Sequence, residues 1–240
     1  MKIVIAKDFV GHAEFIRQLP ERIAEGEGEL IYDGRNRVLR FRHQGLSLMV
    51  KCYKRANVVQ QVAYTFFNKS KAERAFLYAG EFQRRGIDTP PAVAYMECRR
   101  FGLFFIGYFV SLEVAGTECS RLLRDVEQYP PQLAQAVADH IVLMHSRGVL
   151  HGDLNLTNFL CVKGDDGGYR FTMIDTNRSH FCDGMPADDI CLNNLIRLTH
   201  RRDLYRDLVS RYASLRGWDV SETASKALDL LNRFEHRRWK

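Results

Sequence analysis

The alternation of apolar and polar residues predicts a strand-rich beginning of the chain. Residues 29–32, 38–42 and 46–53 are short runs with the pattern of half-buried strands. Turn-forming residues separate them at 33–36 and 43–45. Strands joined in this way form an antiparallel meander, so we expect three neighbouring strands here.

The pattern changes to a helical period after the meander. In residues 68–85, alanine and phenylalanine recur at spacings of three and four, and Gly86 fits a C-cap. A Pro-Pro corner follows at 90–91, and two further strands are predicted at 92–97 and 103–110.

The remainder of the chain is predicted to be mainly helical. Helices are expected at 120–127 and 131–146 and again from 188 onward, with a break near Gly217 and a restart at 221 that runs to the C-terminus. An apolar hairpin at 159–174 lies between them.

These elements predict an α+β protein with a two-lobed, protein-kinase-like fold. A β-rich lobe at 1–110 would contain the meander and one helix, and a helical lobe at 111–240 would contain the hairpin. A chain of 240 residues is long enough for two small lobes that share a cleft.

The strongest chemical signal is the loop at residues 151–158, His-Gly-Asp-Leu-Asn-Leu-Thr-Asn. Phosphoryl transfer needs a carboxylate that orients the attacking hydroxyl and takes its proton, and an oxygen ligand for magnesium. Asp153 and Asn158 supply both groups at the spacing of the kinase catalytic loop. His151 is expected to support this loop rather than to carry a proton.

Three further residues complete the candidate site. Asp175 ends the hairpin and can act beside Asn158 as a second ligand of Mg²⁺. Lys51, in the third strand, matches the kinase lysine that binds nucleotide phosphates. Glu73 is the first candidate for its helical partner and Glu81 the second, while Lys54 is the alternative lysine.

The chain resembles a known family at these positions. Its His-Gly-Asp-Leu run is similar to that of small-molecule and sugar kinases, and residues 70–75 and 86–90 resemble the bacterial lipopolysaccharide core kinases, the Kdo/heptose kinase family. The similarity covers roughly residues 30–200. It implies ATP as donor, a Kdo or heptose hydroxyl of the lipopolysaccharide inner core as acceptor, and a Gram-negative source.

Several positions depart from the protein-kinase pattern. Gly152 stands where regulated kinases carry arginine, so we expect no activation-loop phosphate switch. Asp175 is followed by Thr-Asn instead of Phe-Gly, and no G-x-G-x-x-G precedes Lys51. Residues 108–110 are expected to meet adenine through main-chain groups.

Residues near the site have less specific patterns. Asn177 and Arg178 could line the acceptor site or form a turn, and an arginine there suits a sugar carboxylate or phosphate. Asp188 and Asp189 precede a helix, which predicts N-capping, with bracing of the catalytic loop as a second role.

Composition limits the partners. The net charge of +6 and the pI near 9.0 suit an anionic ligand, an acidic substrate or a phosphate-bearing membrane surface, and do not by themselves indicate nucleic acid. The six cysteines lack zinc spacing and suit buried thiols in a reducing compartment. No apolar run reaches the ~20 residues of a membrane span. We expect a cytoplasmic enzyme with possible peripheral contact to an anionic inner membrane and no nucleic-acid partner.

Two alternative functions remain open from the sequence. The same fold could phosphorylate a protein Ser/Thr or another small molecule. A non-catalytic, nucleotide-binding pseudokinase is the third hypothesis, against which the five matched residues argue.

Overall fold

The computed structural model describes residues 1–238, and the chain divides into two compact units. The sheet unit comprises residues 1–84 and 89–114, and the helical unit comprises residues 85–88 and those from 115 onward. Each unit has its own architecture and is described by itself.

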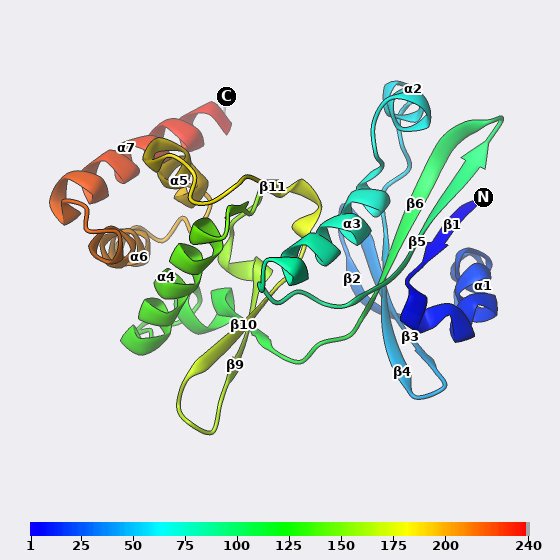
Figure 1. The fold of residues 1–240 in the computed structure, drawn as a ribbon, viewed down its shortest axis with the longest axis horizontal. Coiled ribbons are helices and arrows are strands. Elements are labelled where there is room, and N and C mark those ends of the chain that lie inside the picture. The colour runs from blue at the N-terminus through cyan, green and yellow to red at the C-terminus, as the bar shows by residue number, and fades with distance from the viewer. Residues whose placement is uncertain (239–240) are drawn as a thin grey trace. The chain divides into compact units, whose positions relative to one another are not determined.

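A six-stranded antiparallel sheet forms the centre of the sheet unit, in the order β1-β5-β6-β4-β3-β2 (Figure 1). The strands are β1 (Lys2–Ile5), β2 (Glu29–Asp33), β3 (Arg37–His43), β4 (Leu46–Cys52), β5 (Ala92–Arg100) and β6 (Leu103–Leu112). Pairing of β2 with β3 and of β3 with β4 confirms the predicted meander. Strand β1, which pairs with β5, was not predicted.

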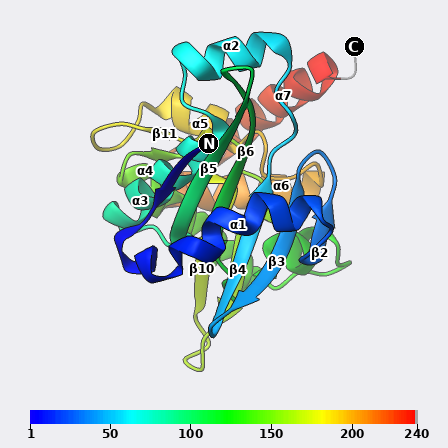
Figure 2. The ribbon, with the colours of Figure 1, turned by 90° about the vertical axis from the view of Figure 1, so that its right-hand side faces the viewer.

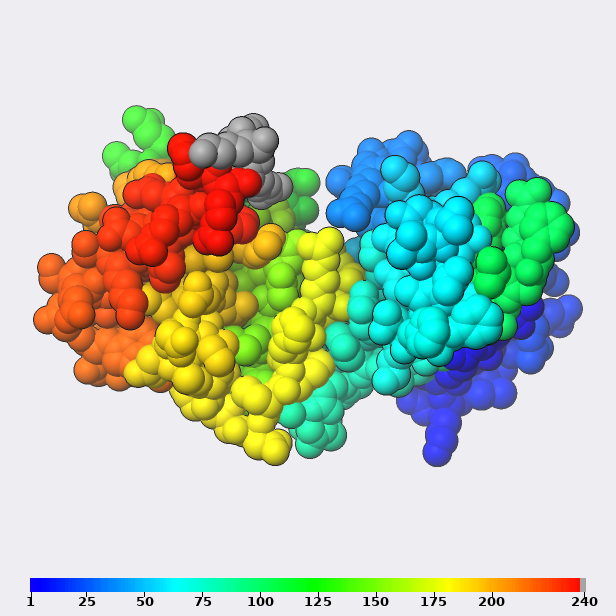
Figure 3. Space-filling view, turned by 90° about the horizontal axis from the view of Figure 1, so that it is seen from above, coloured from blue at the N-terminus to red at the C-terminus, as the bar shows by residue number. Residues whose placement is uncertain are grey.

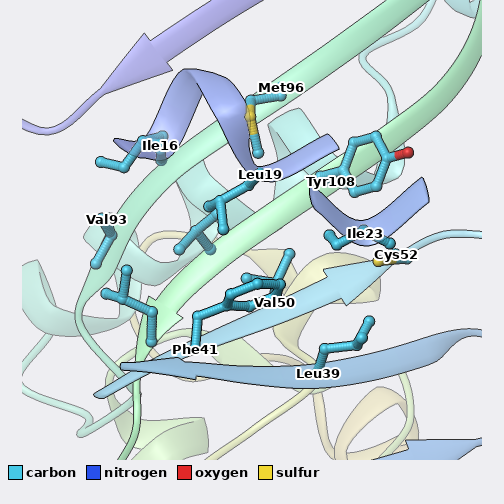
Figure 4. Close-up of a cluster of buried hydrophobic side chains, with 13 residues drawn as sticks. Ile16, Leu19, Ile23, Leu39, Phe41, Val50, Cys52, Val93, Met96 and Tyr108 are labelled. Atoms are coloured by element: carbon cyan, nitrogen blue, oxygen red, sulfur yellow. The ribbon is translucent and has the colours of Figure 1, made fainter. Parts of the chain in front are cut away.

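Helices cover both faces of this sheet. Helix α1 (Ala13–Ala24) lies across one face (Figure 2), where Ile16, Leu19 and Ile23 enter the main hydrophobic core (Figure 4). Helix α3 (Lys71–Arg84), which confirms the predicted helix, packs on the other face through Ala72 and Phe76. Neither α1 nor the short α2 (Val58–Phe66) was predicted.

Helices and short strands make up the helical unit. The helices are α4 (Pro131–Ser146), α5 (Asp188–Leu195), α6 (Arg202–Leu215) and α7 (Val220–Arg238). The strands are β7 (Thr117–Glu118), β8 (Val149–Leu150), β9 (Phe159–Lys163), β10 (Tyr169–Met173) and β11 (His180–Phe181). Helix α4 and the β9–β10 hairpin are as predicted, whereas 120–127 forms only a single π-type turn, Ser120–Arg124. The predicted last helix corresponds to α7, and residues 239–240 lie outside the described part.

Strand pairing in the helical unit positions the catalytic loop. β8 immediately precedes the loop, and β11 follows the end of the hairpin; the two strands pair with each other. The N–H of Leu156 donates to the carbonyl of Leu198, just beyond α5. Both ends of residues 151–158 are therefore held by hydrogen bonds to the unit's framework.

Two findings concern membrane and thiol chemistry. Within residues 1–238, no helix combines the length and the apolarity that crossing a bilayer requires. All six cysteines are free thiols, and four of them are buried.

Candidate active site

His151 anchors the catalytic loop from inside the fold. Its ring is fully buried; Nε2 donates to the carbonyl of Ile174 at 2.9 Å, and Nδ1 accepts from the N–H of Asp153 at 3.2 Å. Burial lowers the pKa of His151, which favours the neutral ring that this pattern of one donor and one acceptor requires. His151 thus holds the start of the loop beside the end of β10, in the supporting role that the sequence suggested.

Asn158 closes the loop on itself. Its Nδ2 donates to the main-chain oxygen of Asp153 at 2.8 Å, and its own main-chain oxygen accepts from the N–H of Ile174 at 3.0 Å. Since the amide nitrogen is engaged in this way, the atom of Asn158 that can bind a cation is the side-chain oxygen Oδ1.

Asp175 has an uncommon backbone conformation. Its φ of 57° lies in the left-handed region, which aspartate tolerates better than most side chains. The Nδ2 of buried Asn177 donates to Asp175 Oδ1 at 2.6 Å. Asn177 therefore orients this carboxylate from within the turn that follows it.

Asn158 and Asp175 meet the chemical requirements of a magnesium site. Their main chains are joined through the Asn158–Ile174 hydrogen bond, and both present hard oxygen atoms. Magnesium is commonly held by one or two such ligands together with substrate phosphates and water. Within residues 1–238, no group of three or more His, Cys, Asp or Glu side chains gathers as a metal cluster.

Two arginines flank the Asp153 carboxylate. Arg178 Nη1 lies 3.7 Å from one carboxylate oxygen, and Arg197 Nη1 lies 3.6 Å from the other. These distances exceed those of direct charge-assisted hydrogen bonds, and the Asp153 side chain remains 32% exposed. The carboxylate is thus oriented yet reachable by a hydroxyl. Arg178 was a candidate from the sequence; Arg197, which follows no motif, was not.

Gly152 is required by a close backbone approach. A Cβ at this position would collide with the carbonyl oxygen and carbonyl carbon of Arg178. Any larger residue would push the 175–179 segment away from the loop. The close approach is therefore a steric reason for glycine at position 152. It adds to the earlier observation that an arginine, which could bind an activation-loop phosphate, does not stand there.

A buried hydrogen-bond relay supports the loop from the helices. Asn194 on α5 donates through Nδ2 to the carbonyl of His151 at 2.9 Å, and its Oδ1 accepts from His145 Nε2 at 3.1 Å. His145 Nδ1 lies 2.8 Å from the hydroxyl of Tyr212, which accepts from Arg216 at 2.7 Å. With Arg216 donating to it, the Tyr212 hydroxyl donates to Nδ1, so each link has one donor and one acceptor.

Asp188 is the acidic end of this relay. Its Oδ1 accepts from Arg216 Nη2 at 2.8 Å. The N-cap of α5 is Ala187, and no side chain caps it, so the predicted N-capping by Asp188 is wrong. The first turn of α5 instead uses this carboxylate to hold Arg216, and Asn194 performs the bracing of the loop.

Lys51 and Glu73 lie on one face of the six-stranded sheet. Lys51 on β4 pairs in register with Phe109, which pairs with Tyr95 on β5. Tyr95 and Phe109 pack in the cluster beneath α3. Lys51 therefore points to the α3 face, as a phosphate-binding lysine of this fold would need to.

Glu73 contacts a different lysine. Its Oε1 accepts from the hydroxyl of Tyr95 at 3.3 Å and from Lys2 Nζ at 3.4 Å. Tyr95 is two strands away from Lys51, and strands are about 4.8 Å apart. Among the described residues of the sheet unit, the structure thus joins Glu73 to Lys2 and Tyr95.

The predicted adenine-binding segment is also corrected. Residues 108–110 lie inside β6, where β4 pairs on one side and β5 on the other. Their main-chain groups are used by the sheet and are not open to an adenine ring. Just beyond β6, the N–H of Glu113 still donates to the carbonyl of Ser47. Main-chain N–H groups outside this ladder therefore begin after Glu113.

Comparisons with known proteins identify the family and the fold. Residues 24–212 match the Lipopolysaccharide kinase (Kdo/WaaP) family. A solved structure described as WaaP in complex with acyl carrier protein superposes with a TM-score of 0.62 at 20% identity, covering 99% of this chain and 98% of that one. This likeness shows the fold, a protein-kinase-like one.

A second solved structure is more distant. The 2.2 Å crystal structure of WbdD superposes with a TM-score of 0.45 at 13% identity, over 82% of this chain and 43% of that one. No curated protein sequence matches the chain.

Proposed function

The chain belongs to the lipopolysaccharide kinase (Kdo/WaaP) family, and we propose that Asp153 is the base with which it phosphorylates an inner-core sugar. Members of this family are phosphotransferases that act on sugar hydroxyls, and this chain is a kinase of the lipopolysaccharide core with a protein-kinase-like fold. Which sugar accepts the phosphate, which residues act and what they bind are the subject of the proposal.

The observation that carries this proposal is the setting of Asp153. Its main chain is held by His151 and Asn158, and its carboxylate remains partly exposed between two arginines. A carboxylate fixed in this way can accept a hydrogen bond from a sugar hydroxyl and take its proton as the oxygen attacks phosphorus.

ATP is the phosphate donor in this proposal, with Mg²⁺ held by Asn158 Oδ1 and the Asp175 carboxylate. When bound, the ion would neutralise charge on the phosphates of the nucleotide. Lys51 would contact the same phosphates from β4. The chain's own contribution is positioning: Asn177 fixes the Asp175 side chain, and the Asn158–Asp153 hydrogen bond sets the spacing of ligand and base.

The two arginines indicate an acidic acceptor. Arg178 and Arg197 bring two positive charges to the place where the hydroxyl would sit. A guanidinium binds carboxylate or phosphate in a planar, bidentate manner. The carboxylate of Kdo, or a phosphate already present on a neighbouring heptose, would provide the matching anion.

Lipopolysaccharide is a lipid-linked sugar, so we infer that a kinase of its core works at a membrane surface. We therefore place it in the cytoplasm with peripheral contact to the anionic face of the inner membrane. The net charge of +6 has the sign that this contact requires.

Transfer of labelled phosphate tests the proposed acceptor. The protein is incubated with γ-labelled ATP, Mg²⁺ and purified core oligosaccharides ending either in Kdo or in heptose, and the products are mapped by mass spectrometry. We expect phosphate on one of these sugars for the wild type and for Asp229→Asn, whose carboxylate is exposed on α7. Label on the protein alone, with none on either sugar, would overturn the proposal in favour of a protein kinase.

A further inference from the structure

Helix α2 in the sheet unit carries its apolar side chains outward. Val58, Val59 and Phe66 are 73%, 77% and 67% exposed, and Val62 between them is also exposed. No residue of α2 is buried. Surface helices of globular proteins show the opposite arrangement, with the apolar stripe toward the core.

A hydrogen bond from β6 holds α2 to the sheet. Thr65 Oγ1 accepts from the N–H of Phe104 at 2.8 Å, while Gln61 Nε2 donates to the carbonyl of Ala56, just before the helix, at 3.0 Å. Asn57 and Gln60 form a capping box at the start of the helix. Since these hydrogen bonds fix the helix, the outward direction of the valines and phenylalanine is set by the fold.

A second apolar projection stands next to α2. Phe101 is at the tip of the β5–β6 hairpin and is 91% exposed. Its φ of 50° is in the left-handed region, a conformation that is strained for an aromatic residue. Tyr64 on α2 meets Phe104, three residues beyond Phe101, edge to face with ring centroids 5.2 Å apart.

The figures show these elements together. α2 lies alongside the end of the β5–β6 hairpin in Figure 2, and their side chains form a continuous stretch of surface in Figure 3. We call this surface the α2 face. Its apolar members are Val58, Val59, Val62, Phe66, Phe67 and Phe101.

Positive charge surrounds the α2 face. Residues 54–71 and 99–104 contain six lysines and arginines and no aspartate or glutamate. Lys54, Arg55, Lys69, Arg99 and Arg100 are exposed. Arg100 stacks over the ring of Phe101 at 5.2 Å and over that of Phe105 at 5.9 Å, so charge and aromatic surface are presented together.

We propose that the α2 face is the surface by which this protein docks on an anionic lipid bilayer. Protruding valines and phenylalanines would enter the boundary between headgroups and acyl chains, while the surrounding cations would contact lipid phosphates. A helix and a hairpin tip that project suit a bilayer better than a folded partner, which would need a matching groove. The inference rests on the proposed peripheral membrane contact and assigns it to particular residues.

Vesicle co-sedimentation of the full chain tests this assignment. The probes are phosphatidylcholine vesicles with and without phosphatidylglycerol. The apolar variant combines Phe66→Ser with Phe101→Asn, and the charge variant combines Lys69→Glu with Arg99→Glu. Control variants change exposed groups of the helical unit and of α1: Ile190→Ser with Leu215→Ser, and Arg17→Glu with Arg206→Glu.

We expect each α2-face variant to bind anionic vesicles at least about tenfold more weakly than the wild type, and each control to bind within about twofold of it. Equal losses in the controls, or undiminished binding by the α2-face variants, would overturn the proposal. Capture of an acidic carrier protein by the α2 face, with no binding to anionic vesicles, would overturn it as well.

Two further readouts separate this proposal from the enzymatic one. The α2-face variants should phosphorylate a delipidated core oligosaccharide at the wild-type rate and keep the wild-type melting temperature, because the changed side chains are exposed. Asp153→Asn should bind vesicles like the wild type. A loss of vesicle binding in Asp153→Asn, or of soluble-acceptor activity in the α2-face variants, would contradict the separation of the two surfaces.

Discussion

The side-chain amide of Asn194 donates to the main-chain oxygen of His151 at 2.9 Å and accepts from His145 at 3.1 Å. Asn194 on α5 therefore connects the catalytic loop to the buried ring of His145 on α4. The relay continues to Tyr212 on α6 and to Arg216, the C-cap residue of that helix, so the position of the loop depends on contacts among three helices.

Replacing Asn194 should weaken both folding and turnover. Asn194→Ala leaves the oxygen of His151 and the Nε2 of His145 without a partner, at a cost of about 1–3 kcal/mol for each buried group. We expect a lower free energy of unfolding in urea and a reduced kcat. Asn193→Ala is the matched control, because its exposed amide donates to the carbonyl of Asp189 within α5 itself. Equal stability of the two variants would argue against the relay.

A side chain at position 152 should separate the loop from the 175–179 segment. In Gly152→Ala the new methyl group meets the carbonyl of Arg178, and overpacking of this kind costs about 1–3 kcal/mol. We expect kcat to fall with the melting temperature. In contrast, Gly80 is exposed on helix α3 with open space around it, so Gly80→Ala should stabilise by about 1 kcal/mol. An active, fully stable Gly152→Ala enzyme would show that the close approach is not needed.

Stability should fall in mild acid because buried histidines are neutral in the folded protein. Burial lowers the pKa of His140 and of His145 to about 4 and also lowers that of His151. An unfolded histidine titrates near 6.5, so between pH 6.5 and about 4 the unfolded chain binds more protons. Stability present above pH 6.5 is therefore lost as the pH falls, by up to about 1.4 kcal/mol per pH unit for each histidine.

His140→Phe isolates one part of this dependence. The Nε2 of His140 is buried and has no hydrogen-bond partner among residues 1–238, and the ring packs against Phe159 and Phe171. A phenylalanine fits the same contacts without a proton to bind. The free energy of unfolding, measured in urea between pH 6.5 and about 4, should depend less steeply on pH, and the decrease in slope should correspond to about one proton fewer bound on unfolding. An unchanged slope would mean that His140 does not contribute.

Arg197 should bind the anionic group of the acceptor sugar. Removing its guanidinium in Arg197→Gln is expected to raise the KM for the core sugar by about tenfold, the equivalent of about 1.4 kcal/mol, while the KM for ATP stays constant. Arg206→Gln, an exposed arginine on α6, serves as the control. A rise in the KM for ATP instead would assign Arg197 to the nucleotide.

The sequence predicted the catalytic loop because its residues are contiguous. Asp153, Asn158 and the end of the hairpin at Asp175 are close in the chain, and their spacing carries the chemistry. The partners that position them are distant: Asn194 is 43 residues from His151, and Lys2 is 71 residues from Glu73. No local pattern marks such contacts, which is why the relay and the partners of Glu73 were not predicted.

Two helices were missed for different physical reasons. Helix α1 contains Pro20, a residue that normally breaks a helix interior, and is held by its apolar stripe against the sheet. Helix α2 begins with valines, which favour strands, and its capping box and polar contacts make it helical. Its outward apolar face is also the feature that led to the proposed docking surface.

The kinetic effect of Asp153→Asn tests the central claim most directly. Asparagine keeps the size of the side chain but cannot take a proton, so we expect kcat to fall by about 10²–10⁴-fold. The Kd for ATP with Mg²⁺, measured by calorimetry, should stay within about twofold of the wild type, and Asp229→Asn should be unaffected in both measurements. Wild-type turnover by Asp153→Asn would contradict the assignment of Asp153 as the base of this lipopolysaccharide kinase.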